Sequence, residues 1–349
     1  METAAFDYEL PADRIAQVPV EPRDSARLLV DRGKGHAPEH RTVADLPSLL
    51  QPGDLLVVNT TRVLPARLLL QKPTGGAVEV FLLEPLGDGI WEALVRPSRR
   101  APPGTLLEPR FRHNAEIVEL SVEVGAHATA EEGTRQVRLH TSDEAAALAA
   151  HGAVPLPPYI TTELDDPERY QTVFAERPES VAAPTAGLHL TPEILAGANV
   201  AHVELAVGLG TFKPMTADQV EDHHMHEERY RVPVETLAAC EAAERVVAVG
   251  TTAVRALESA ARRGELEGRT DLFIHRPFDW QVVDVLLTNF HLPRSSLLVL
   301  VDAFLGDGSH AAAGQCDVPR WRDLYAEALA TGYRFLSFGD AMLLTRSPS

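Results

Sequence analysis

The sequence has few cysteines and no long hydrophobic run. Cys240 and Cys316 are the only cysteines in 349 residues, which excludes a disulfide-rich scaffold and a four-cysteine zinc site. No apolar run approaches the roughly 18 residues that span a bilayer. Residues 1–10 are acidic and lack the basic segment and apolar stretch of a secretory signal. We therefore expect a cytoplasmic protein.

Lysine is also scarce, since only Lys34, Lys72 and Lys213 are present. The 32 basic and 50 acidic residues give a net charge of −18. Because phosphate binding depends on Lys and Arg, this charge excludes a protein that holds nucleic acid by bulk electrostatics alone. It leaves room for a local basic patch. At about 150 residues per domain, the length predicts about two domains.

The pattern of apolar residues changes along the chain. Closely spaced strand candidates separated by turns lie at 78–83, 90–95, 106–111, 117–124 and 136–140. Such strands are typical of a small antiparallel barrel. Beyond 155, strands alternate with helices, and the apolar runs 297–301 and 333–338 predict further strands. We predict an α/β core domain, discontinuous over 1–65 and 154–349, with an inserted antiparallel β-barrel domain at 66–153.

Two loops combine small residues with hydroxyl groups. The first contains Thr185 and Gly187, and its small side chains would let a ligand approach the backbone. The second follows a predicted strand and contains Gly208, Gly210 and Thr211, whose backbone N–H groups could face an anion or a nucleoside. It lacks the third glycine of a dinucleotide-binding fingerprint. For either loop, a purely structural turn is the alternative.

The densest titratable cluster spans 221–228 and includes His223 and His226. Its mixed ligands raise the possibility of zinc or iron, but the spacing does not match a metal-binding helix, and we predict no metal. Imidazole titrates near neutrality, so His223 and His226 are candidate general bases. A solvated polar turn is the structural alternative.

Two strand ends carry convergent polar groups. A buried strand at 245–249 is followed by a Gly-Thr-Thr turn with Thr251 and Thr252 and then by a helix, in which Arg255 lies one turn in. Helix N-termini at strand ends favour a carboxylate or phosphate. Another strand end carries groups suited to a nucleoside pocket, namely Asn289, Phe290 and His291. A capped helix and a core phenylalanine are the corresponding structural alternatives.

Arginines cluster in the predicted barrel. Arg96, Arg99 and Arg100 lie close together in the sequence, with Arg110 and Arg112 nearby. A local phosphate-binding face is one interpretation. A solvated surface is the other, because no aromatic residues are interleaved as they are in single-strand binders.

Taken together, these motifs resemble the S-adenosylmethionine:tRNA ribosyltransferase-isomerase family of queuosine biosynthesis. The matching stretches run nearly end to end: Pro-Arg-Asp-Ser-Ala-Arg-Leu-Leu (22–29), Asn-Thr-Thr-Arg-Val-Leu-Pro-Ala-Arg-Leu (59–68), Ala-Ala-Pro-Thr-Ala-Gly-Leu-His (182–189), Gly-Leu-Gly-Thr-Phe (208–212), Gly-Thr-Thr (250–252), Thr-Asn-Phe-His-Leu-Pro (288–293) and Gly-Asp-Ala-Met (339–342). So many ordered matches are highly specific.

The resemblance implies a monomeric two-domain enzyme with a barrel inserted in an α/β core. It also implies that S-adenosyl-L-methionine is a co-substrate whose ribosyl moiety moves onto 7-aminomethyl-7-deazaguanine in a tRNA anticodon loop. The products are epoxyqueuosine, adenine and methionine. The sulfonium acidifies the adjacent 5′ hydrogens, so a base of suitable pKa could start the reaction.

For this reaction, the chemistry of the side chains suggests roles for particular residues. His189, His223 or His226 is the expected base, and Thr251, Thr252 and Arg255 are expected to bind the methionine carboxylate. Asn289, Phe290 and His291 are expected to line the adenine or ribose site. RNA phosphate is expected at Arg23, Arg62 and Arg67.

The chain departs from the usual family pattern at Ala206, Ala253, 275–277 and Asp302. A relative that uses a small-molecule deazaguanine acceptor therefore remains an alternative, as does a non-catalytic RNA-binding relative. Release of adenine and methionine with the modified tRNA would identify the tRNA-modifying enzyme, and release with the free base alone would identify the relative with a small-molecule acceptor. Release with neither acceptor would identify the non-catalytic relative. The polar strand ends favour an enzyme, since a scaffold does not need them.

Overall fold

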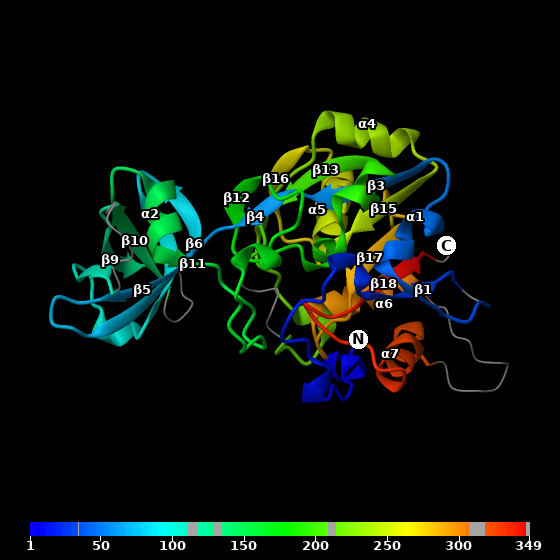
Figure 1. The fold of residues 1–349 in the computed structure, drawn as a ribbon, viewed down its shortest axis with the longest axis horizontal. Coiled ribbons are helices and arrows are strands. Elements are labelled where there is room, and N and C mark those ends of the chain that lie inside the picture. Colours follow the sequence, from blue (N-terminus) through cyan, green and yellow to red (C-terminus); the bar gives the residue numbers. More distant parts are fainter. Residues whose placement is uncertain (34, 111–117, 129–133, 209–213, 307–317, 347–349) are drawn as a thin grey trace. The chain divides into compact units, whose positions relative to one another are not determined.

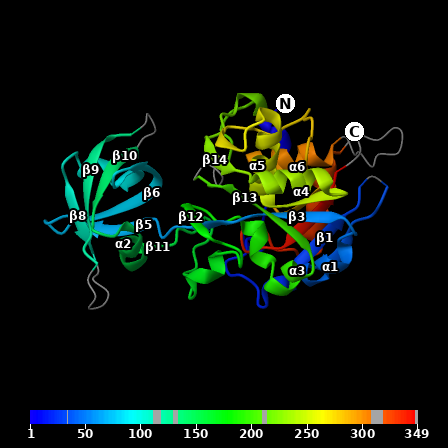
Figure 2. The same ribbon diagram turned by 90° about the horizontal axis from the view of Figure 1, so that it is seen from above.

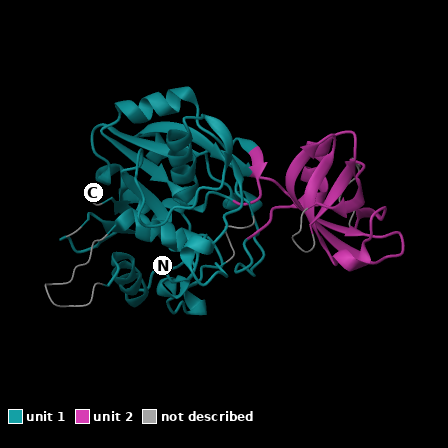
Figure 3. Cartoon of the chain, turned by 180° about the vertical axis from the view of Figure 1, so that it is seen from behind, with its two compact units in different colours: residues 1–62, 157–177, 183–349 teal, residues 63–156, 178–182 magenta. Residues whose placement is uncertain are grey.

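The structure of the chain is a computed structural model. It describes all residues except 34, 111–117, 129–133, 209–213, 307–317 and 347–349 (Figure 1). The described residues divide into two compact units, one of Met1–Arg62, Pro157–Arg177 and Ala183–Ser349, the other of Val63–Leu156 and Pro178–Ala182 (Figure 3). In the described part of the chain, no helix is both long and apolar enough to cross a membrane.

The larger unit is built on a mixed nine-stranded sheet. In pairing order its strands are β16 (Glu267–Thr270), β14 (Glu228–Arg231), β13 (Asn199–Leu205), β3 (Asp54–Asn59), β15 (Arg245–Val249), β17 (Val285–Asn289), β18 (Ala341–Thr345), β1 (Arg27–Asp31) and β2 (Glu39–Thr42). The four central strands β13, β3, β15 and β17 are mutually parallel. Parallel strands need helical crossovers, as the alternating pattern predicted.

Helices cover both faces of this sheet (Figure 2). The α-helices of the larger unit are α1 (Leu46–Leu49), α3 (Pro192–Ala196), α4 (Val234–Ala242), α5 (Gly250–Arg263), α6 (Ser296–Leu305) and α7 (Arg320–Ala330). Its 3-10 helices are η1 (Thr3–Phe6), η2 (Ala12–Arg14), η3 (Arg23–Ser25), η4 (Val43–Asp45), η6 (Pro167–Tyr170), η7 (Thr185–His189) and η9 (Val220–Asp222).

The main core lies between the sheet and the helices that cover one of its faces. Alternate strand residues such as Leu56, Val58, Val247 and Val249 point into one apolar cluster with residues of η4, α1, η7 and α3. Their neighbours point to the opposite face, because side chains alternate along a strand. The amphipathic helix α5 packs against β3, β13, β15 and β17. Burial on both faces explains why the central strands are continuous apolar runs.

The smaller unit is a closed antiparallel barrel. Its strands pair in the order β5 (Arg67–Gln71), β6 (Ala77–Gly87), β7 (Ile90–Arg96), β10 (Thr134–His140), β9 (Ser121–His127) and β8 (Leu106–Pro109), and β8 pairs back onto β5. The short β11 (Gly152–Ala153) extends the same edge of β5, after helix α2 (Glu144–His151). A 3-10 helix, η5 (Ser98–Arg100), follows β7. The predicted fold class is confirmed.

The compact barrel unit also includes 178–182, which the sequence-based boundaries of 66 and 153 leave out. Strand β12 (Arg177–Ser180) pairs with β4 (Thr61–Val63), and the Leu64 N–H donates to the Ser180 carbonyl at 2.9 Å. This pairing joins segments more than 100 positions apart, so no local pattern announces it.

Two predicted strands are wrong. Residues 297–301 lie in α6, whose N-cap Ser295 accepts a hydrogen bond from the Leu298 N–H through its hydroxyl. A short apolar run fits a buried helix as well as a strand, and here the cap decides. Residues 333–338 contain only an isolated bridge from Phe335 to Ile15, after which the chain turns with Leu336 in the left-handed region at φ 68°. The final strand, β18, begins at Ala341.

Candidate active site

The predicted polar loops of the core meet at one edge of the sheet. Strands β3, β13, β15 and β17 run in the same direction, so their ends at Asn59, Leu205, Val249 and Asn289 share that edge. Ligands of open α/β sheets bind outside the carboxyl ends of the strands. This edge is the candidate active site.

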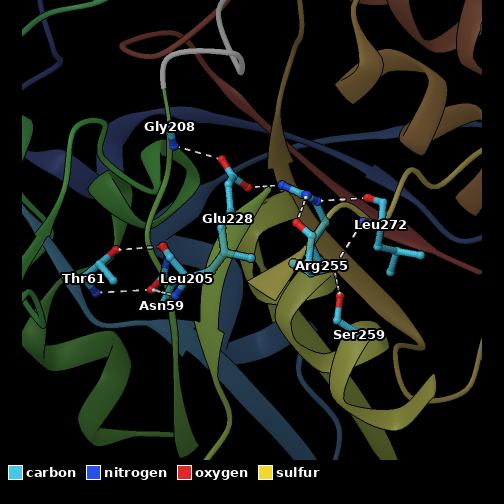
Figure 4. A network of polar contacts seen from close by, with 9 residues as sticks. Asn59, Thr61, Leu205, Gly208, Glu228, Arg255, Ser259 and Leu272 are labelled. Atoms are coloured by element: carbon cyan, nitrogen blue, oxygen red, sulfur yellow. Dashed lines mark hydrogen bonds and ion pairs between the residues drawn. The ribbon is translucent and has the colours of Figure 1, made fainter. Parts of the chain in front are cut away.

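Asn59 clamps the end of the neighbouring strand. Its Oδ1 accepts the N–H groups of Leu205 at 3.1 Å and of Thr61 at 3.2 Å, and its Nδ2 donates to the Leu205 carbonyl at 3.0 Å (Figure 4). Asn59 is fully buried. These bonds fix the point at which the chain leaves β13.

A buried ion pair lies beside this exit (Figure 4). Arg255 donates from Nη1 to Glu228 Oε2, and Glu228 Oε1 accepts the Gly208 N–H at 2.9 Å. Arg255 also donates to the carbonyls of Leu272 at 3.1 Å and Thr270 at 3.3 Å. The structure thus differs from the prediction that Arg255 binds a substrate carboxylate, because its guanidinium binds a carboxylate of the protein. Packing of α5 against β14 brings the two residues together.

A second polar cluster lies under the end of β17. Thr185 donates from its hydroxyl to Asn289 Oδ1 at 2.9 Å, and Asn289 Nδ2 lies 3.4 Å from His189 Nε2. With Oδ1 turned to Thr185, the Asn289 amide donates to His189, so Nε2 is the accepting nitrogen. Asn289 Nδ2 also lies 3.5 Å from the carbonyl of Asp340. Three predicted site residues from two separate parts of the sequence thus come together.

His189 is a neutral imidazole at neutral pH. Burial, which is the largest cause, and the charge of Arg334 lower its pKa to about 4 against the opposing effect of a hydrogen bond with the Arg23 backbone. Only 4% of the surface of the whole residue is exposed. A neutral imidazole can accept a proton without first losing one.

Phe290 lies in the core and not at a ligand wall. It is completely buried, and its ring contacts those of Tyr325, Tyr333 and Phe335 at centroid distances of 4.7 to 5.6 Å. Of the two interpretations left open by the sequence, the structure shows the core phenylalanine. Its strand neighbour Asn289 points instead to the site, because adjacent residues take opposite faces.

His291 is buried next to Phe290. Its Nε2 lies 3.0 Å from the Thr288 hydroxyl, its backbone N–H donates to Tyr325, and its carbonyl accepts from Tyr8. Burial lowers the pKa of the imidazole to about 3. His291 is therefore also neutral and its contacts anchor the turn after β17.

The N-terminus of α5 lies beside η7. Gly250 starts the helix in the left-handed region at φ 86°, and a Cβ added to it would lie 3.7 Å from that of Ala186. Thr251 is buried. The hydroxyl oxygen of Thr252 is hidden from solvent and has no hydrogen-bond partner among the residues that the structure describes. Buried hydroxyls normally have partners, so this oxygen fits a ligand atom at the helix N-terminus.

The histidine cluster has a different environment. His223 is half-buried with its ring edge-on to Phe273 at 5.4 Å, and burial lowers its pKa. His226 is exposed. Among the described residues, no three His, Cys, Asp or Glu side chains are arranged to hold a metal ion.

Two arginines predicted to bind RNA phosphate have protein partners. Arg23 donates to the carbonyls of Gln171, Leu188 and Glu168 at 2.9 to 3.1 Å, so it ties η3 to η6 and η7. This differs from the prediction, since the carbonyls occupy its donors. Arg62 pairs with the exposed Glu168 carboxylate.

The barrel arginines differ in their contacts. Arg67 pairs with Glu79 at 2.7 Å, although half of its side chain is exposed. Arg96, Arg99 and Arg100 are exposed at the end of β7 and in η5.

The glycine-containing loops are described only in part. Gly187 is needed for packing, because a Cβ there would lie 2.7 Å from the Phe174 ring and 3.1 Å from Thr172 Cγ2. Packing against these two side chains is therefore sufficient to explain this glycine. Gly210 and Thr211 lie outside the described residues.

Some departures from the family pattern contact each other. Arg276 donates from Nη2 to Asp302 Oδ1 at 2.5 Å, which joins the loop at 275–277 to α6. Ala206 continues β13 by donating its N–H to the Arg229 carbonyl at 2.9 Å, and Ala253 is buried in α5. Arg276 and Asp302 therefore neutralise each other, and neither of these two departures leaves a charge without a partner.

Sequence reasoning missed Glu228 as a site residue. The residue ends the titratable cluster at 221–228, but no local signal shows which of those carboxylates is buried. Its 6% exposure and its two partners appear only when β14 is placed beside β13 and α5.

Comparison with known proteins decides the family. A model of the family described as queuosine biosynthesis protein matches residues 3–344. The chain belongs to this family. Relatives named S-adenosylmethionine:tRNA ribosyltransferase-isomerase include those of Thermotoga maritima, 46% identical with 99% of this chain and 100% of the relative covered, and Thermus thermophilus, 50% identical with 97% and 98% covered.

A solved structure of the family is also similar. The crystal structure of S-adenosylmethionine tRNA ribosyltransferase from Thermotoga maritima matches with a TM-score of 0.52 and 38% sequence identity. The match covers 97% of this chain and 99% of that chain. The match therefore extends over both compact units of this chain.

Proposed function

We propose that this chain transfers and isomerises the ribosyl moiety of S-adenosylmethionine onto 7-aminomethyl-7-deazaguanine in tRNA. The products are epoxyqueuosine in the tRNA, free adenine and methionine. Near-complete coverage by relatives of 46% and 50% identity that bear this enzyme name is the observation that carries the proposal. The modified base would lie in the anticodon loop.

The carboxyl-end edge of the sheet is the proposed S-adenosylmethionine site. The N-terminus of α5 presents the backbone N–H groups of a first helical turn, and the Thr252 hydroxyl in that turn has no partner among the residues that the structure describes. A carboxylate gains most from such donors because helix N-termini are partly positive. We therefore assign Thr251 and Thr252 to the methionine carboxylate. Asn289 lies at the same edge and can offer an amide to the ribose or adenine.

The reaction needs a base next to the sulfonium. Removal of a 5′ proton places an electron pair beside sulfur, and adenine leaves with the glycosidic electron pair. The amine of the deazaguanine then bonds to the anomeric carbon and gives up a proton, and the bond from that carbon to the ring oxygen breaks. The 5′ electron pair forms a bond to the anomeric carbon, and the freed ring oxygen closes the epoxide by displacing methionine from the 5′ carbon. His189 is the proposed base, because its Nε2 carries no proton and lies at the strand edge, where it would exchange its 3.4 Å contact with Asn289 Nδ2 for the 5′ hydrogen of the substrate. His223 and His226 are the competing candidates.

The direct test incubates the purified protein and S-adenosylmethionine with tRNA that carries the aminomethyl-deazaguanine. Adenine and methionine release together with a mass gain on the tRNA is the expected result. Release with the free base alone would instead identify a small-molecule acceptor. Absence of release with either acceptor would contradict the enzyme assignment.

The base is tested by replacing His189, His223 and His226 separately with asparagine. Exchange of the 5′ hydrogen in heavy water reports proton removal independently of the later steps. We expect His189→Asn to lose exchange while the other two variants retain it. Loss of exchange in His226→Asn alone would assign the role to that histidine.

The RNA-binding proposal concerns the exposed Arg96, Arg99 and Arg100 of the barrel. Replacing Arg99 and Arg100 with alanine should weaken tRNA binding and lower the slope of its salt dependence by about one for each lost phosphate contact. The KM for S-adenosylmethionine should stay unchanged. An unaltered salt slope would exclude phosphate contacts at these positions.

A further inference from the structure

The chain after β13 is held at two points. Asn59 bonds both backbone groups of Leu205, and Glu228 accepts the N–H of Gly208 at 2.9 Å (Figure 4). Gly208 is the first residue of the Gly-Leu-Gly-Thr-Phe sequence at 208–212. The two contacts therefore fix where that sequence begins relative to the strand edge.

Glu228 is itself held in one orientation. Its side chain and that of Arg255 are each 6% exposed, and Arg255 binds the carboxylate oxygen that Gly208 does not use. Arg255 is oriented in turn by the carbonyls of Leu272 and Thr270. A fully partnered buried charge pair has little freedom to rearrange, because any movement would leave a charge without a partner.

The contact with Glu228 does not require a glycine at position 208. A Cβ added there would lie 3.8 Å from Glu228 Oε1, an ordinary contact distance. The carboxylate therefore recognises the backbone N–H and not the lack of a side chain. A charged acceptor makes a stronger bond to such a group than a neutral one does.

We propose that Glu228 is a positioning residue for the S-adenosylmethionine site and that Arg255 acts through Glu228 without touching the substrate. Glu228 places Gly208 at the site edge, and Arg255 holds the carboxylate in position for that bond. The inference rests on the proposed function, since it assigns the role to the same strand edge.

A double-mutant cycle tests how the two residues act. The variants are Glu228→Ala, Arg255→Met and the double variant, with KM for S-adenosylmethionine and kcat measured separately. Loss of a hydrogen bond to a charged group predicts a rise in KM of roughly tenfold to a hundredfold for each single variant. The KM of the double variant should be no higher than that of the more impaired single variant, because both changes remove the same anchor.

Conservative and control variants separate positioning from stability. Glu228→Gln keeps an oxygen for the Gly208 N–H, so its KM should rise less than that of Glu228→Ala. Asp54→Asn serves as the control, because it breaks a comparable ion pair in which Asp54 lies 2.6 Å from Arg245. Both residues lie at the starts of β3 and β15, the ends of these strands that point away from the proposed site. We expect this control to lower the melting temperature while leaving KM unchanged.

Hydrogen exchange provides a readout that does not depend on activity. In the intact protein, exchange of a peptide covering 205–208 should speed up in Glu228→Ala and stay as in the wild type in Asp54→Asn. If the wild type forms no product, the proposed function fails, while this measurement still decides whether Glu228 anchors Gly208.

The outcomes are distinct. A non-additive cycle with faster exchange at 205–208 supports the inference. Multiplicative losses of affinity in the double variant would mean that Arg255 contacts the substrate directly, and would overturn it. Unchanged exchange in Glu228→Ala would also overturn it.

Discussion

Acid should destabilise the protein partly through His189. Its pKa is about 4 in the folded chain, whereas an imidazole in an unfolded chain has a pKa of about 6.5. The unfolded state therefore binds more protons between these two values. The free energy of unfolding must fall as the pH drops through this window, because protonation favours the state that binds the proton.

The size of the effect follows from the two pKa values. At about pH 7.5 both states are essentially deprotonated, so His189 makes almost no difference to stability. At about pH 5 the unfolded imidazole is almost fully protonated and the folded one is not, which costs about 2 kcal/mol of stability. His291, with a pKa of about 3, adds a similar amount over the same range.

Urea unfolding at the two pH values measures this contribution. The fall in the free energy of unfolding between them should be about 2 kcal/mol smaller in His189→Gln than in the wild type. Other titrating groups contribute equally to both proteins and cancel in the difference. The matched replacement His226→Gln, at an exposed position, should keep the wild-type pH dependence. An identical fall in His189→Gln and wild type would refute the assignment of a buried, neutral imidazole.

Three further predictions concern packing, substrate and charge. Gly187→Ala should cost about 1–3 kcal/mol in unfolding free energy, because its Cβ would lie 2.7 Å from Phe174; an unchanged melting temperature would contradict this packing role. Thr252→Val should raise KM for S-adenosylmethionine about tenfold and leave the melting temperature intact, whereas an unaltered KM would remove the hydroxyl from the site. Asp31→Asn should destabilise the fold by about 3–5 kcal/mol in urea, since Asp31 pairs with Arg320 and both are 1% exposed; a loss below about 1 kcal/mol would show that the pair is not energetically coupled.

The fold class could be predicted because its signals are local. Strands with alternating burial and tight turns indicated the barrel, and the strand, glycine turn and helix around Gly250 indicated the α/β core. Where two structures fit one local pattern, the prediction was wrong, as at 297–301, where the Ser295 cap selects a helix. The segment 178–182 was missed because its strand partner is distant in the sequence.

The sequence by itself also determined two polar loops at strand ends, one of which brought Asn289 forward, and a loop of small residues before a helix, which brought Thr185 and His189 forward as site candidates. Strand direction and helix starts are set by neighbouring residues, so they can be inferred from the sequence. Only the tertiary structure decided which charged or polar groups already have partners. Arg255 was expected at a substrate and binds Glu228, because a buried charge takes the partner that packing supplies, however far along the chain it lies.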